Sequence, residues 1–251
     1  MYSQLLALLL MSGITSAAQP VLMPAEIPND PPAITEPAEI PGLETDFSAL
    51  AKLDNTASGW GPGTRMNAED RPESPVIYQE KYGKYDADFI KANTENVYLT
   101  IDEGYENGYT AQILDVLKEK NCPAVFFVTL PYVKQNPELV QRMIDEGHVV
   151  GSHSVTHPSA GMPSLSLDTQ SDEISQLHQY VKDHFDYDMY LFRYPAGIFS
   201  EQSLALMQQM GYRSVFWSFA YRDWVTDDQP DPDEADSEEH TSELQSRVDI
   251  S

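Results

Sequence analysis

The sequence predicts an α/β fold, a parallel sheet or barrel, over residues 96–225. Two observations carry this prediction. Short apolar runs such as 124–128 suit buried parallel strands, which are covered on both faces. Segments with apolar residues at helical spacing separate these runs, and such strand–helix alternation is typical of parallel sheets.

Each predicted element has a local signal. Strands are expected at 97–101, 124–128, 148–152, 190–193 and 214–217, and helices at 110–117, 137–146, 166–185 and 201–210. Thr110 is the expected N-cap of the first helix, and Gly147 and Gly211 should end the second and fourth. His178 and His184 fall in the longest helix and are expected on its surface. Because the strands should run parallel, their carboxyl ends should meet at one edge, where α/β folds carry their sites.

The N-terminal part of the chain predicts export. Residues 1–18 hold an apolar run that is too short to span a bilayer and then small residues, as in a signal peptide. We therefore expect an extracytoplasmic protein, secreted or associated with the cell wall; a buried helix or an incorrect start codon are the alternatives. Residues 19–45 are rich in Pro, Glu and Ala, which predicts an extended acidic linker. Residues 46–95 predict an irregular N-terminal extension that packs on the domain.

Residues 226–251 predict a disordered tail that is not native. They are polar and strongly acidic, without strand or helix periodicity, and 238–246 looks like the translation of a sequencing adapter. In this interpretation the domain at 96–225 is incomplete and C-terminally truncated. The alternative is a genuine disordered acidic tail.

The charge of the chain argues against several classes of partner. The formal net charge is −25, from 15 basic and 40 acidic residues. Phosphate binding needs clustered Lys and Arg, so we expect no nucleic acid partner and no docking on anionic lipid. No stretch after the N-terminal run is long enough for an integral membrane span. Cys122 is the only cysteine, so no intramolecular disulfide can form.

Side chains that could bind a metal ion and move protons follow the predicted strands. Asp102 and Glu103 end the first strand, where an acidic pair before Gly is by itself ordinary turn chemistry. His153 and His157 follow the third strand, and a helical turn between them would let both imidazoles reach one ion. Taken alone, they could also be a pair of loop histidines. A mixed carboxylate and imidazole set suits zinc or another divalent ion.

The order of four motifs resembles the polysaccharide deacetylase family, the carbohydrate esterases with a NodB-homology domain. The matching segments are TIDEG at 100–104, HSVTH at 153–157, RYPAG at 193–197 and Asp223-Trp224, against TFDDG, H-S/T-x-x-H, RxPxG and an acidic residue beside Trp in the family. The resemblance covers roughly 96–225. The segment GYENGY at 104–109 looks most like the delta-lactam-type peptidoglycan N-acetylmuramic acid deacetylases.

The resemblance implies a deformed (β/α) barrel that hydrolyses N-acetyl groups on amino sugars, with peptidoglycan as the polysaccharide substrate. It implies that His153, His157 and Glu103 hold a divalent ion, with zinc expected, which lowers the pKa of a bound water towards ~7. Asp102 would then be the general base, kept ionised by Arg193.

The resemblance also implies residues around the substrate. A backbone N–H near Tyr105 would help to stabilise the oxyanion. Asp223 would complete the catalytic set. The residues expected to contact substrate are Tyr105, Pro195 and Trp224.

Two departures from the family pattern bear on activity. Glu103 stands where the family usually has Asp, and its extra methylene moves the carboxylate. No Leu-x-His, the family's source of the proton for the leaving amine, follows Trp224. We therefore expect weak metal binding and poor or no turnover. The alternatives are a catalytically incomplete fragment or non-catalytic cell-wall-binding protein, and chitin or xylan as the substrate.

Overall fold

The centre of the fold is a six-stranded parallel sheet. The structure, a computed structural model, describes residues 46–69, 71–92, 97–218 and 220. Within them the strand order is β2-β8-β6-β5-β4-β3, and every neighbouring pair is parallel. The strands are β2 (Ala87–Asp88), β3 (Thr100–Glu103), β4 (Val125–Val128), β5 (Val149–Ser152), β6 (Leu191–Phe192) and β8 (Arg213–Val215). The predicted α/β class with a parallel sheet is therefore confirmed.

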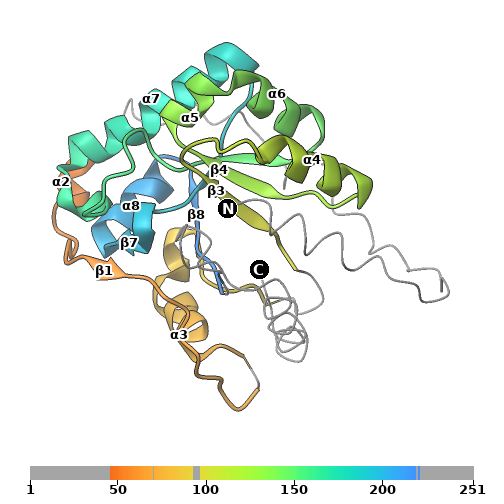
Figure 1. Cartoon of the computed structure of the whole chain (residues 1–251). Coiled ribbons are helices and arrows are strands. Elements are labelled where there is room, and N and C mark those ends of the chain that lie inside the picture. The colour runs from red at the N-terminus through yellow and green to blue at the C-terminus, as the bar shows by residue number, and fades with distance from the viewer. Residues whose placement is uncertain (1–45, 70, 93–96, 219, 221–251) are drawn as a thin grey trace.

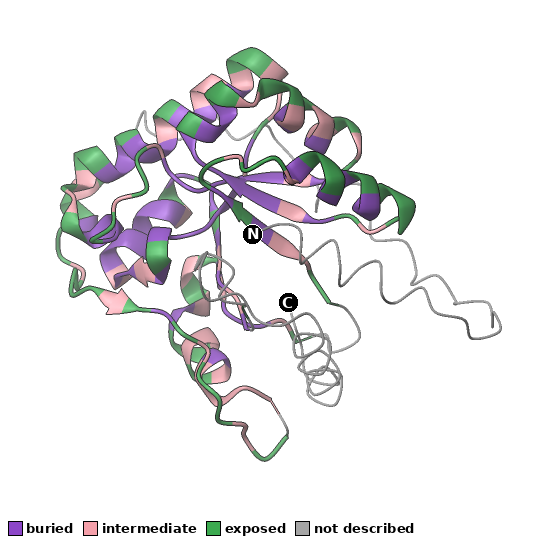
Figure 2. Cartoon of the chain, viewed as in Figure 1, coloured by how far each residue is buried: buried purple, intermediate pink, exposed green. Residues whose placement is uncertain are grey.

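Helices pack along the sheet (Figure 1). They are α2 (Phe47–Leu50), α3 (Glu73–Tyr82), α4 (Thr110–Glu119), α5 (Leu130–Gln135), α6 (Pro137–Asp145), α7 (Leu167–Phe185) and α8 (Glu201–Gln209), with 3-10 turns η1 (Gly83–Tyr85), η2 (Met162–Ser164) and η3 (Pro195–Gly197). Figure 2 shows that buried residues lie on the strands and along one side of the helices. In the described part of the chain, we find no helix with the length and apolar character that a bilayer span requires.

Short polar signals set the helix ends. The Ser166 hydroxyl accepts from the Thr169 N–H at the start of α7, 3.2 Å away, and Gly147 (φ +83°) follows α6 in the left-handed region that glycine tolerates. Thr110, expected as a cap, is the first residue of α4 instead. The Glu106 carboxylate replaces it, because it accepts from the N–H groups of Tyr109 and Thr110, at 2.9 and 3.4 Å.

The region before the domain is more regular than expected. Helix α3 and strand β2 lie within 46–95, where irregular structure was predicted, and β2 joins the central sheet beside β8. A second, two-stranded sheet pairs β1 (Ser58–Gly59) with β7 (Ile198–Phe199) in antiparallel fashion. Two-residue strands carry too little periodicity to be found in the sequence.

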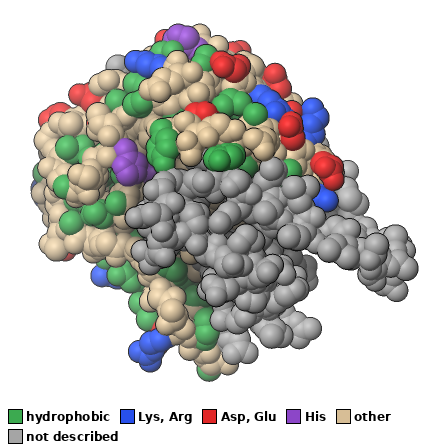
Figure 3. Space-filling view, viewed as in Figure 1, with side chains coloured by type: hydrophobic (Ala, Val, Ile, Leu, Met, Phe, Trp, Pro, Cys, Tyr) green, Lys and Arg blue, Asp and Glu red, His purple; other side chains and the backbone are tan. Residues whose placement is uncertain are grey.

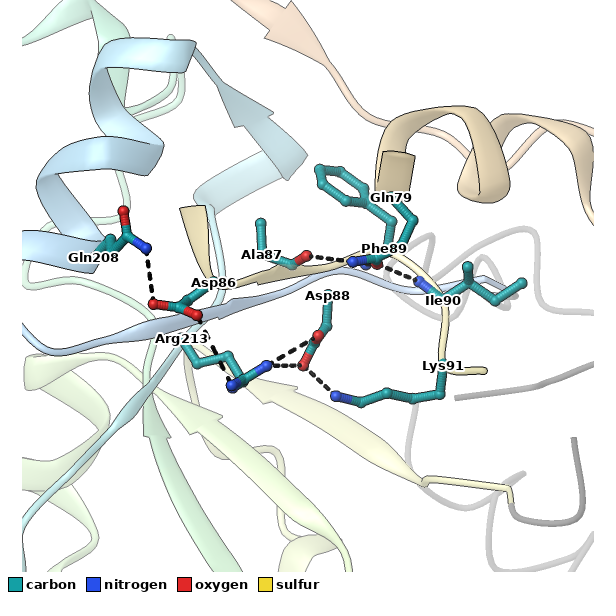
Figure 4. A network of polar contacts seen from close by, with 9 residues as sticks. All are labelled: Gln79, Asp86, Ala87, Asp88, Phe89, Ile90, Lys91, Gln208 and Arg213. Carbon is teal, nitrogen blue, oxygen red and sulfur yellow. Dashed lines mark hydrogen bonds and ion pairs between the residues drawn. The ribbon is translucent and has the colours of Figure 1, made fainter. Parts of the chain in front are cut away.

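A polar network fastens β2 to β8 (Figure 4). Arg213 Nη1 lies 3.2 Å from both carboxylate oxygens of Asp88, which also pairs with Lys91. The Gln79 side chain, reaching over from α3, donates to the Ala87 carbonyl at 3.1 Å and accepts from the Phe89 N–H at 2.7 Å. One amide side chain thereby pairs with a backbone group of β2 and with one of the residue directly after it.

Gln79→Ala is expected to destabilise the protein by about 1–3 kcal/mol, because it leaves those part-buried backbone groups without their partner. Urea unfolding followed by circular dichroism measures the change. Glu80→Ala, at an exposed position on the same helix, is the matched control and should have little effect. Equal losses in the two variants would contradict the role given to Gln79.

The expectation that His178 lies on the surface is wrong. His178 follows Ile174 by four residues, so it falls on the buried stripe of α7 and is 2% exposed. Its Nδ1 lies 2.6 Å from the Tyr212 hydroxyl. Burial lowers the pKa of His178, and the nearby Asp188 carboxylate opposes that shift only in part. The other histidine of the helix, His184, is exposed as expected.

The lowered pKa of His178 predicts a loss of stability in mild acid. In the unfolded chain a histidine titrates near its ordinary pKa of about 6.5, so below that pH the unfolded state binds the proton more readily than the folded state. The melting temperature should therefore fall from pH 7.5 to 5.5, measured with a chelator present, and fall less in His178→Gln. His184→Gln is the control and should keep the full dependence. Identical pH profiles for all three proteins would contradict the prediction.

Candidate active site

Three strand ends bring Asp102, His153 and Arg193 together. Asp102 lies in β3, His153 directly follows β5 and Arg193 directly follows β6. The sheet ladder continues past the strands: His153 N–H donates to the Val128 carbonyl at 2.9 Å, and Arg193 N–H donates to the Ser152 carbonyl at 3.0 Å. These hydrogen bonds fix the backbones of His153 and Arg193 at the carboxyl edge of the sheet, the edge at which Asp102 also lies in β3.

Arg193 holds one oxygen of Asp102. Arg193 Nη1 lies 2.9 Å from Asp102 Oδ1, and the exposed fractions of the two side chains are 4% and 39%. The guanidinium carbon lies 4.3 Å from the centre of the Phe127 ring and 5.6 Å from that of Trp217. A buried cation in contact with two aromatic rings therefore donates a charge-assisted hydrogen bond to a carboxylate that reaches solvent.

The tautomer of His153 follows from its surroundings. Its Nδ1 lies 2.8 Å from the Arg193 carbonyl oxygen, which can only accept, so Nδ1 carries the proton. Burial lowers the pKa of His153, with Asp102 acting in the opposite direction. The neutral ring presents the lone pair of Nε2, 3.9 Å from Asp102 Oδ2. This is how a metal-binding histidine is usually oriented.

His157 lies beside His153, but not through a helical turn. Their ring centres are 4.8 Å apart. The segment between them is a non-helical loop in which Ser154 (φ +71°) and His157 (φ +50°) adopt left-handed conformations. The His157 N–H donates to the Ser154 hydroxyl at 3.0 Å. The two imidazoles lie close together, as predicted, but a loop held by side-chain hydrogen bonds brings them there instead of a helical turn.

Glu103 does not join the histidines. Neighbouring residues of a strand point to opposite faces, so Glu103 is buried where Asp102 is exposed. Its Oε1 accepts from the Thr110 hydroxyl at 3.3 Å. No group of three or more His, Cys, Asp or Glu in the described ranges is arranged to hold a metal ion. The two imidazoles fit a divalent ion, and Glu103 as placed does not supply the expected third ligand.

The remaining predicted residues fall in different places. Tyr105 is 54% exposed beside the site. Pro195, expected to contact substrate, is buried in η3. Asp223 and Trp224 lie outside the described residues. On the face shown in Figure 3, Lys and Arg of the described part are scattered among Asp and Glu and do not form one patch.

Other residues around the site escaped the sequence interpretation. Phe127 lies in an apolar run that signals only a buried strand, yet it stacks on Arg193. Trp217 covers the same guanidinium, and the backbone carbonyl of Trp217 accepts from Trp60 Nε1 at 2.9 Å. Glu173, which lies on α7, contacts the loop between His153 and His157. A buried acidic residue inside a helix leaves no periodic signal, so a single sequence could not have revealed it.

The chain is similar in sequence to proteins that are already known. Residues 89–215 match the family described as "Polysaccharide deacetylase". The chain is 39% identical over 178 residues to the Bacillus subtilis protein "Peptidoglycan-N-acetylmuramic acid deacetylase PdaA", a match that covers 70% of this chain and 66% of the relative. The matched stretch thus spans about two thirds of that curated relative.

Two solved structures are similar in fold as well as in sequence. The Bacillus subtilis PdaA structure, described as a family 4 carbohydrate esterase, has a TM-score of 0.64 at 37% identity, covering 70% of this chain and 74% of that one. A family 4 carbohydrate esterase from Bacillus anthracis has a TM-score of 0.60 at 38% identity, covering 69% and 78%.

Proposed function

Because the chain belongs to the polysaccharide deacetylase family of hydrolases, we propose that it removes N-acetyl groups from the amino sugars of peptidoglycan. The observation that carries the proposal is the exposed Asp102 carboxylate, held by buried Arg193 and facing Nε2 of His153. This arrangement combines a proton acceptor with a neutral imidazole at the sheet edge. The name of the Bacillus subtilis relative, a peptidoglycan-N-acetylmuramic acid deacetylase, supports peptidoglycan as the polysaccharide.

Each residue has a distinct task in this proposal. Asp102 accepts a proton from the attacking water through Oδ2, because Oδ1 is occupied by Arg193. His153 and His157 offer ring nitrogens to a divalent ion, for which we propose zinc. When bound, the ion supplies the Lewis acid that polarises the acetyl carbonyl. Tyr105, exposed directly after the strand end, contacts the sugar.

We also propose that the protein acts outside the cytoplasm. The apolar run and small residues within 1–18 support export, and the Pro-rich segment 19–45 supports a tether that lets the domain reach the wall. Both segments lie outside the described residues.

Acetate release tests the proposal. The purified chain with added Zn²⁺ is incubated with N-acetylated glycan strands of peptidoglycan, and with chitin oligomers and acetylated xylan in parallel. We expect acetate from the peptidoglycan strands, released slowly as the two departures from the family pattern predict, and less or none from the other two. Binding to the glycan without acetate release would support the alternative of a non-catalytic wall-binding protein. Preference for chitin or xylan would contradict the proposed substrate.

A further inference from the structure

One carboxylate orders the loop that carries the two histidines. Glu173 lies on α7 and is 7% exposed. Its Oε2 accepts from the Val155 N–H at 2.9 Å and the Thr156 N–H at 2.8 Å, and its Oε1 accepts from the Thr156 hydroxyl at 2.7 Å. All three donors belong to residues between His153 and His157, so Glu173 anchors the segment that joins the two histidines.

The conformation of this loop depends on hydrogen bonds from outside the loop. Two non-glycine residues, Ser154 and His157, have positive φ angles, which the backbone adopts only when its surroundings impose them. His153 is fixed separately, through its own N–H and its Nδ1. His157 is exposed, and its backbone N–H donates to the Ser154 hydroxyl. The conformation of the loop therefore determines the position of the His157 ring.

We propose that Glu173 is a positioning residue that sets the distance between the two imidazoles for a divalent ion. The inference rests on the proposed function, since it takes the histidine pair as the ion site. Glu173 acts through the backbone of the loop and contacts neither substrate nor ion. Carboxylates behind metal ligands typically change metal affinity by about 10–100-fold when removed.

The test is Zn²⁺ affinity, measured by competition with a chromophoric chelator. Glu173→Ala should weaken Zn²⁺ binding by about 10–100-fold. Glu173→Gln should restore most of it, because its amide oxygen can still accept both N–H groups and its amide nitrogen can donate to the Thr156 hydroxyl. Asp172→Asn, at the exposed neighbouring position on α7, is the matched control and should bind as the unaltered chain does.

A second variant covers the case in which Glu173→Ala does not fold. Thr156→Val removes one of the three hydrogen bonds from the surface side and should weaken Zn²⁺ binding by about fivefold. Unchanged affinity in every variant that folds, checked by circular dichroism of the zinc-free proteins, would overturn the inference. So would an unaltered chain that binds no Zn²⁺. Zn²⁺ binding without acetate release would overturn the proposed function alone.

Discussion

Asp102→Asn is expected to lower the rate of acetate release by about 10²–10⁴-fold, the usual effect of removing a general base. The amide cannot take up a proton at neutral pH. Its oxygen can still accept from Arg193 Nη1, which lies 2.9 Å from Oδ1 in the unaltered protein, so the fold and the guanidinium should stay in place. The measurement is kcat for acetate release at saturating Zn²⁺.

Two results qualify this test of Asp102. Asp172→Asn makes the same chemical change at an exposed position on α7 and should leave kcat unaltered. The melting temperature of Asp102→Asn should stay close to that of the unaltered chain. A rate for Asp102→Asn that matches the control would contradict the role of Asp102 as base.

His153→Ala should abolish Zn²⁺ binding, whereas Glu103→Gln should leave the Zn²⁺ affinity nearly unchanged. His153 is the buried imidazole whose Nε2 faces the site. Removing a residue that supports a metal ligand lowers metal affinity by at most about 100-fold, so the loss of the ligand His153 itself should weaken Zn²⁺ binding by more than that. Glu103 is buried against Thr110 on the other face of β3. Isothermal titration with Zn²⁺ measures both affinities.

The comparison between these two variants decides the ligand set. Circular dichroism of the zinc-free proteins controls for misfolding, which matters because both positions are buried. An affinity loss in Glu103→Gln as large as that in His153→Ala would make Glu103 a ligand and contradict its placement in the structure.

The long elements could be predicted because periodicity and caps agreed. Helix α7 begins after Ser166 and ends at Phe185, as expected, since its apolar residues recur on one face and a hydroxyl caps its first turn. Helix α5 was missed: it has six residues, starts two residues after β4 and is capped by Thr129, so no apolar repeat develops. Strand β2 was missed because its two residues cannot show alternation.

The site could be predicted where its residues lie at the end of a strand. Asp102, His153 and Arg193 meet because parallel strands place their carboxyl ends together. Glu103 shows the limit of that argument, since strand alternation sends it to the opposite face. Contacts made across the fold, such as Glu173 to Thr156, depend on packing between elements that no local pattern encodes.

The pairing of β2 with β8 also bears on how the chain folds as it is synthesised. Asp88 and Arg213, which join these strands by an ion pair, are 125 residues apart. Strands β3, β4 and β5 can pair in the order in which they emerge, while β2 waits unpaired until β8 is made. Closing so long a loop costs entropy before any contact repays it. The first strand of the sheet to be synthesised is therefore the last to be paired, and the stacked rings of Phe89 and Phe216, 4.1 Å apart, come together only with it.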